Sequence, residues 1–157
     1  MSTRYWLMKS EPEAFSIEDL RDRSGGVEAW DGVRNYQARN FMRDEMKQGD
    51  RAIFYHSGRH PAAVGTMRVV REGYPDETAL DTESDHYDPR SSPENPIWFM
   101  VDVKFESIFR RPVPLAEIRG IETLSGMQLL KKGNRLSIMP VTRKEFDTIL
   151  RLGNRDA

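Results

Sequence analysis

Residues 97–109, IWFMVDVKFESIF, constrain the fold more than any other stretch of the sequence. In an extended chain, successive side chains point to opposite faces. One face of this stretch would then carry five apolar side chains: Ile97, Phe99, Val101, Val103 and Phe105. The other face begins with Trp98 and Met100, so we expect it to be partly covered too. This is the strongest strand signal in the chain, and it predicts a fold built on a β-sheet.

Four shorter segments also have the composition of strands: residues 5–9, 51–56, 62–70 and 135–141. Only SGRHP separates the second from the third, which predicts an antiparallel pair with a tight connection. Pro140 is expected to halt the last strand, because proline has no N–H to donate to a sheet. No repeated strand–helix–strand spacing is present, so we expect a mostly antiparallel sheet.

Short helices are expected between and after these strands. Ser16 is followed three residues later by Asp19, a pair that caps the first turn of a helix. Thr142 and Glu145 repeat this pattern before the C-terminal segment. Between about residues 35 and 47, apolar residues recur at helical spacing. We predict an α+β fold: one domain, residues 1–157, with a small, mostly antiparallel β-barrel of five to six strands and peripheral short helices.

The sequence contains no cysteine, which excludes disulfides, cysteine-based zinc sites and a thiol nucleophile. No run approaches the roughly 18 apolar residues that a membrane-spanning helix needs. The N-terminal residues also lack the apolar stretch of a secretory signal. We therefore expect a cytoplasmic monomer with no membrane partner.

Charge is unevenly distributed, although the net charge is only −1. Residues 74–96 contain seven acidic side chains and one basic side chain, Arg90, so the rest of the chain carries a net charge of +5. A basic body beside an acidic loop rich in Pro and Ser is compatible with a polyanionic partner. An ordinary charged surface, which is the commoner case, has the same composition.

Catalytic and metal-binding motifs are scarce. The common phosphate-binding, dinucleotide-binding, zinc-protease and serine-hydrolase motifs do not occur. His56 and His60 are four residues apart, but the glycine and proline around them disfavour a helix, so the imidazoles do not share a face. Asp85, His86 and Asp88 are interpreted as part of a flexible acidic loop rather than as metal ligands. We predict no catalytic residue, no metal and no cofactor.

Three polar and aromatic stretches have the composition of a ligand site, and the third, FYHS at residues 54–57, is equally typical of a core strand. Lys9-Ser10-Glu11 ends the first predicted strand, and side chains at strand ends converge at the mouth of a small barrel. Trp30 comes directly before an Asp-Gly turn, so its indole projects from a loop or a strand end. A nucleobase outside a helix needs an aromatic face, here Trp30, and edge contacts, here Ser10, Glu11 and the amide of Asn35. Simpler interpretations are a solvated strand exit and a core tryptophan.

From about residue 4 to residue 152, the sequence resembles the EVE domain family, whose members include bacterial single-domain proteins. The resemblance is carried, in order, by YWLMKSEPEAFSIEDL, WDGVRNYQARNFMR, GDRAIFYHS, the strand that contains Gly65, HYDPRSSPENPIWFMVDVKF and GNRLSIMPV. It implies a PUA-like fold, similar to ASCH and YTH domains, with a pocket at the barrel mouth. EVE domains are thought to be readers of modified bases in DNA or RNA, and YTH domains hold methylated adenine in an aromatic cage.

The resemblance also implies individual pocket residues. Three of them match a lysine-serine-polar stretch beside the YTH cage: Lys9, Ser10 and Glu11. Trp30 matches a tryptophan that follows the glycine-containing loop, and is the expected stacking wall. Tyr87 stands where a YTH domain offers a second cage aromatic, and it is not a tryptophan. Three further candidates are placed by strand position: Tyr55, Ser57 and Ser137.

We expect a non-enzymatic module that flips a modified cytosine or adenine derivative, in DNA or RNA, into this pocket. Four cations are predicted from charge to contact phosphates: Arg34, Arg39, Lys131 and Lys132. One alternative is a nucleoside- or nucleotide-processing enzyme of ASCH-like type, with Lys9 and Glu11 as nucleophile or acid–base pair. Another is a protein-interaction module that uses the acidic loop.

Overall fold

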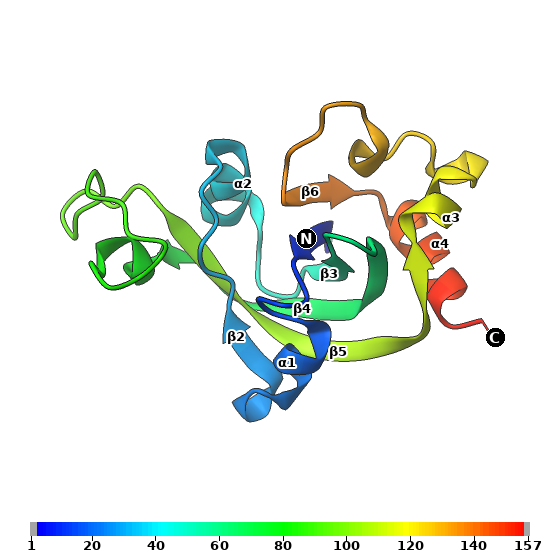
Figure 1. Cartoon of the computed structure of the whole chain (residues 1–157), viewed down its shortest axis with the longest axis horizontal. Coiled ribbons are helices and arrows are strands. Elements are labelled where there is room, and N and C mark those ends of the chain that lie inside the picture. The colour runs from blue at the N-terminus through cyan, green and yellow to red at the C-terminus, as the bar shows by residue number, and fades with distance from the viewer. Residues whose placement is uncertain (1–2, 156–157) are drawn as a thin grey trace.

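The computed structural model describes residues 3–155, and six strands form one mixed sheet in the order β2-β5-β4-β3-β1-β6. The strands are β1 (Tyr5–Ser10), β2 (Val27–Ala29), β3 (Arg51–His56), β4 (Ala62–Pro75), β5 (Phe99–Pro114) and β6 (Ile138–Val141). The predicted antiparallel pairing of residues 51–56 with the next strand is confirmed. Figure 1 shows the long strand β5 running along much of the molecule, with β4, β3 and β6 above it.

Short helices surround this sheet, as predicted. They are α1 (Ile17–Asp22), α2 (Tyr36–Asn40), the π-helical turn η2 (Phe41–Glu45), α3 (Leu115–Arg119) and α4 (Arg143–Gly153), with 3-10 turns η1 (Ser24–Gly26), η3 (Glu77–Leu80), η4 (Glu122–Leu124) and η5 (Gln128–Leu130). Ser16 and Asp19 cap α1 reciprocally, and Thr142 and Glu145 cap α4 in the same way. The expected α+β fold, a sheet with peripheral short helices, is therefore confirmed. No helix in the described part of the chain is long and apolar enough to cross a membrane.

The sheet does not close into a barrel, and this part of the prediction was wrong. The edge strands β2 and β6 each pair on one side only, with β5 and β1 respectively. The sheet is also mixed, since β1 and β3 are parallel. Pro140 does not halt β6, which continues to Val141, because an edge strand tolerates a residue that donates no hydrogen bond.

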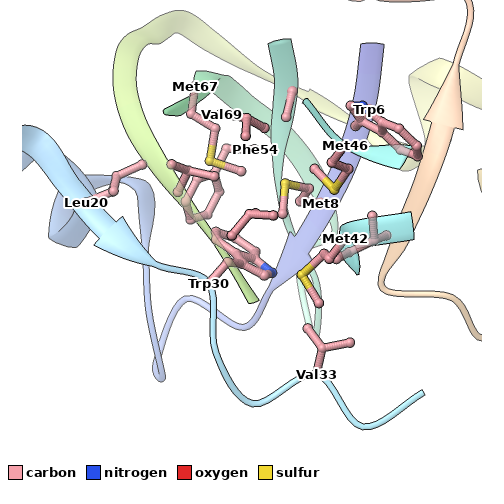
Figure 2. Close-up of a cluster of buried hydrophobic side chains, with 14 of the residues drawn as sticks. Trp6, Met8, Leu20, Trp30, Val33, Met42, Met46, Phe54, Met67 and Val69 are labelled. Carbon is pink, nitrogen blue, oxygen red and sulfur yellow. The ribbon is translucent and has the colours of Figure 1, made fainter. Parts of the chain in front are cut away.

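Two hydrophobic clusters cover the two faces of the sheet. Along β1, Trp6 and Met8 belong to one cluster and Leu7 belongs to the other, as the alternation of side chains in a strand requires. The first cluster includes Trp30, which Figure 2 shows among methionine side chains that include Met42. The second cluster lies against α4 and the segment between α3 and β6.

Candidate nucleic-acid interface

A cavity of about 420 Å³ lies at the C-terminal end of β1. Its walls come from the end of β1, the segment that leads into α1, and the loop between β2 and α2. Five residues predicted for the site line it: Lys9, Ser10, Trp30, Arg34 and Ser137. Residues that lie far apart in the sequence therefore meet at one end of the sheet.

Trp30 belongs both to the core and to the cavity wall. The residue is only 6% exposed. Its ring meets Phe54 edge-on, at 5.4 Å between centroids, and Phe15 edge-on at 6.2 Å. The backbone N–H of Trp30 donates to Val101 O at 2.7 Å, which attaches the residue to β5. In this position the indole borders the cavity as a rigid apolar wall, but it does not offer a whole ring face to a base.

The loop that follows Trp30 is held by a buried carboxylate, Asp76. The N–H of Gly32 donates to Asp76 at 2.9 Å, and the guanidinium of Arg34 donates to the same carboxylate at 3.1 Å. Burial alone would raise the pKa of Asp76, but hydrogen bonds from Thr78, Gly32 and Arg34 hold it below its usual value. Arg34 also donates to the carbonyl of His86 at 2.7 Å. Its guanidinium therefore fixes the cavity wall, and its predicted phosphate contact stays a prediction.

Two carboxylates that the sequence did not single out line the cavity, Glu28 and Asp31. Glu28 accepts from Arg23 at 2.6 Å. Asp31 forms no ion pair or side-chain hydrogen bond within residues 3–155. Burial, and then the nearby charge of Asp76, raise the pKa of Asp31. The oxygens of Asp31 are therefore free to accept hydrogen bonds from a ligand in the cavity. In the sequence, Asp31 could be noticed only as the first residue of the Asp-Gly turn.

Lys9 and Ser10 approach the cavity from the end of β1. The hydroxyl of Ser10 donates to the carbonyl of Phe15 at 2.7 Å, so its lone pairs remain available as acceptors. The ammonium of Lys9 lies 5.9 Å from the centroid of the Tyr55 ring. Partial burial lowers the pKa of Lys9, and no carboxylate forms an ion pair with it in the part of the chain described here.

The family model described as "EVE domain" matches residues 4–152. The chain belongs to the EVE domain family. Human thymocyte nuclear protein 1 is 45% identical over 170 residues, which cover 97% of this chain and 75% of that protein. The crystal structure of human THYN1 in complex with 5-methylcytosine containing DNA has a TM-score of 0.92 at 44% identity, covering 99% of this chain and 100% of that chain.

Two other solved structures are similar to this chain, one at high and one at low sequence identity. A protein from Pseudomonas syringae has a TM-score of 0.90 at 45% identity, covering 95% of this chain and 99% of that chain. An ASCH protein from Zymomonas mobilis has a TM-score of 0.55 at 12% identity, covering 95% of each chain, and this likeness concerns the fold alone. The family resemblance inferred from the sequence is confirmed.

Three residues predicted for the pocket of this EVE domain line neither the 420 Å³ cavity nor the second cavity described below: Glu11, Asn35 and Tyr87. The amide oxygen of Asn35 caps α2 by accepting from the N–H of Ala38 at 2.9 Å. Tyr87 is 41% exposed on the segment between β4 and β5. Arg39, predicted to contact phosphate, donates to the carbonyl of Ile97 at 2.7 Å. The binding roles of these residues stay predictions.

The remaining predicted residues gather at a second cavity, of about 460 Å³: Tyr55, Ser57, Lys131 and Lys132. Lys9 lines this cavity as well as the first. Within residues 3–155, no group of three or more His, Asp or Glu side chains is placed to hold a metal ion. His56 instead accepts from the N–H of Ile17 at 3.1 Å and so supports the start of α1.

Proposed function

We propose that this EVE domain binds DNA that carries a modified cytosine, with the modified base turned out of the helix into the 420 Å³ cavity. The observation that carries the proposal is the human THYN1 complex with 5-methylcytosine containing DNA, a structure that covers 99% of this chain at a TM-score of 0.92. Binding of this kind requires no catalytic group. The ASCH-like enzyme alternative assigns Lys9 and Glu11 to one centre, and Glu11 is not among the residues that line the cavity.

The chemistry of the cavity suits a cytosine. The 4-amino group of cytosine is a hydrogen-bond donor, and a carboxylate is its usual protein partner. Asp31 has free oxygens at the cavity wall for this contact. Lys9 is a donor for the ring carbonyl of the base, and the indole of Trp30 is the apolar surface for a 5-methyl group.

The first test compares DNA duplexes that differ only at one cytosine, unmodified or 5-methylated, by fluorescence anisotropy. Burial of one methyl-sized group contributes about 0.8 kcal/mol, so we expect about fourfold tighter binding of the methylated duplex. Matched RNA and methyladenine oligonucleotides test the wider sequence-based prediction in the same assay. Equal affinity for the methylated and unmodified duplexes would contradict the proposal.

The second test removes the proposed edge contact. Asp31→Ala leaves the amino group of the bound base without an acceptor, a loss of about 1–3 kcal/mol, or about 5- to 150-fold in affinity. Asp85→Ala is the matched control, because it removes the same charge from an exposed position that does not line the cavity. The control should bind DNA as tightly as the parent or slightly more tightly, since it removes a repulsive charge. A gain in affinity for both variants would show that Asp31 acts only through its charge.

Trp30→Ala is a poor test of stacking. The ring belongs to the core, and loss of a buried tryptophan costs about 3–5 kcal/mol of folding free energy. Reduced binding by that variant would therefore report on stability as much as on the base.

A further inference from the structure

The second cavity lies at the same end of the sheet as the first, but over the opposite hydrophobic cluster. Tyr55 and Leu129 line it and belong to the cluster that includes Leu7, whereas Trp30 and Val33 line the first cavity and belong to the other. Residues 131–134 of the loop between η5 and β6 line the second cavity. This loop lies above β6 at the top of Figure 1. Lys9, next to the end of β1, borders both cavities.

Basic side chains without partners surround this second cavity. Four cations that line it form no ion pair within residues 3–155: Lys9, Arg119, Lys131 and Lys132. No Asp or Glu is among the described residues that line it. Pairing is common elsewhere: Arg111 of β5 donates to Glu117 of α3 at 2.7 Å. Arg119, two residues after Glu117 in the same helix, has no such partner within residues 3–155.

Two hydroxyl groups add neutral donors to these charges. Tyr55 and Ser57 line the cavity, and neither hydroxyl is hydrogen-bonded to a residue in the described part of the chain. Burial raises the pKa of Tyr55 to about 12, so its hydroxyl keeps the proton at neutral pH. A site with several cations, free hydroxyl donors and no carboxylate attracts an anion that has several acceptor oxygens.

We propose that this basic cleft, lined by Lys9, Arg119, Lys131 and Lys132, binds the backbone phosphate next to the base held in the first cavity. The proposal rests on the proposed function, because the phosphate belongs to the DNA strand whose modified base occupies the first cavity. Lys9 connects the two sites: the base enters on one side of the end of β1, and the sugar–phosphate chain continues to the other side. Phosphate contacts of this kind position a strand without reading its sequence.

The test measures the affinity for methylated and unmodified duplexes at several salt concentrations. Lys131→Gln with Lys132→Gln removes two adjacent exposed cations from the cleft. Each lost phosphate contact should reduce the slope of log K against log salt by about 0.9, so we expect a decrease of about 1 to 2. The ratio of affinities for methylated and unmodified DNA should stay unchanged. Arg143→Gln with Lys144→Gln is the charge-matched control, since this exposed pair in α4 lines neither cavity.

The outcomes separate the two proposals. An unchanged slope together with an intact preference for methylated DNA overturns the cleft and leaves the base site standing. A reduced slope in a protein that does not prefer methylated DNA supports the cleft and contradicts the proposed function. An equal decrease in the control pair overturns the cleft, because net charge then explains it. A wild-type protein that binds no DNA overturns both.

A final comparison distinguishes the DNA backbone from a free anion. Inorganic phosphate replaces chloride at constant ionic strength, and the DNA affinity of the parent is measured again. Unchanged affinity is expected if the cleft recognises a diester held in place by the bound base. Strong inhibition that is equal in the parent and in the Lys131/Lys132 double variant would place the anion-sensitive contact outside the cleft and overturn the proposal.

Discussion

The two cavities of this EVE domain share Lys9 but differ in how their charges are used. In the first, three of the five charged lining residues form ion pairs: Arg23 with Glu28 at 2.6 Å, and Arg34 with Asp76 at 3.1 Å. In the second, the cations have no ionic partner within residues 3–155. Internal pairing fixes the shape of the first cavity, whereas unpaired charge gives the second a strong attraction for anions and less shape specificity.

The same difference is general in nucleic-acid recognition, where contacts to bases determine which base is bound and contacts to phosphates position the strand. Changes to the support of the first cavity should therefore alter stability and base preference. Changes in the basic cleft should alter affinity and salt dependence. The first two predictions below test the support of the first cavity, and the third tests a second buried carboxylate of the acidic segment.

The largest effect is expected from Asp76→Ala. The side chain of Asp76 is fully buried, and its loss removes the acceptor of the Gly32 N–H and of Arg34. Breaking a buried ion pair by removing one partner costs about 3–5 kcal/mol. For a protein of this size, that loss lowers the melting temperature by roughly 6–20 °C, which a thermal melt measures directly.

Asp85→Ala is the control for this variant, since Asp85 is an exposed residue of the same acidic segment. Its stability should lie within about 0.5 kcal/mol of the parent. The surviving folded Asp76→Ala protein should lose much of its preference for the methylated duplex and keep its salt slope. Equal stability of the two variants would mean that the buried carboxylate does not support the cavity wall.

A smaller effect is expected from Gly32→Ala. Gly32 has a φ of 77°, a left-handed conformation that costs an L-residue about 1–2 kcal/mol. A Cβ at this position would also lie 2.6 Å from Cε1 of His86. Gly133, at the basic cleft, has a φ of 79° and no atom within 4 Å of such a Cβ. Gly133→Ala therefore measures the conformational cost alone, by chemical denaturation.

The difference between the two glycine variants isolates the contact with His86. We expect Gly32→Ala to be less stable than Gly133→Ala by about 1 kcal/mol, a typical cost of overpacking. Adding His86→Ala to Gly32→Ala should remove that difference. If the two single variants are equally stable from the start, His86 moves away freely and does not constrain the loop.

Features of the fold that depend on residues close together in the chain were predictable from the sequence. The capping pairs at Ser16 and Thr142, and the alternation in residues 97–109, each involve a few adjacent positions. The parallel pairing of β1 with β3 and the open edges of the sheet depend on contacts between distant segments. β2 was missed because three residues, Val27–Ala29, are too few to show an alternating pattern.

The same contrast between local patterns and contacts over long sequence separations holds for the candidate site. Lys9, Ser10 and Trp30 were found because they lie at strand ends and match a family motif. The attachment of Arg34 to Asp76 spans 42 positions, and no local pattern indicates such a pair. The acidic segment was interpreted as a flexible surface loop, but Asp76 and Asp88 within it are buried. The net charge of the segment gives only the number of its carboxylates. The role of each carboxylate depends on whether it accepts hydrogen bonds from other residues.

The smallest expected effect is a pH dependence carried by Asp88, the second buried carboxylate of this segment. Hydrogen bonds from Arg90, and one from the indole N–H of Trp98 at 2.7 Å, hold the pKa of Asp88 well below its usual value. The folded state therefore favours the ionised form. Its contribution to stability is complete above the unfolded pKa of about 3.9, and it is lost as pH falls through the lower folded value.

Asp88→Asn keeps the shape of the side chain but not its charge. We expect a lower melting temperature than the parent at neutral pH, and a difference that shrinks progressively below about pH 4, as the parent carboxylate becomes protonated. Asp85→Asn should have the same melting temperature as the parent across this pH range. Asp85 is exposed, and its carboxylate accepts no hydrogen bond from a side chain within residues 3–155. A gap between Asp88→Asn and the parent that stays constant down to low pH would show that the charge of Asp88 contributes nothing.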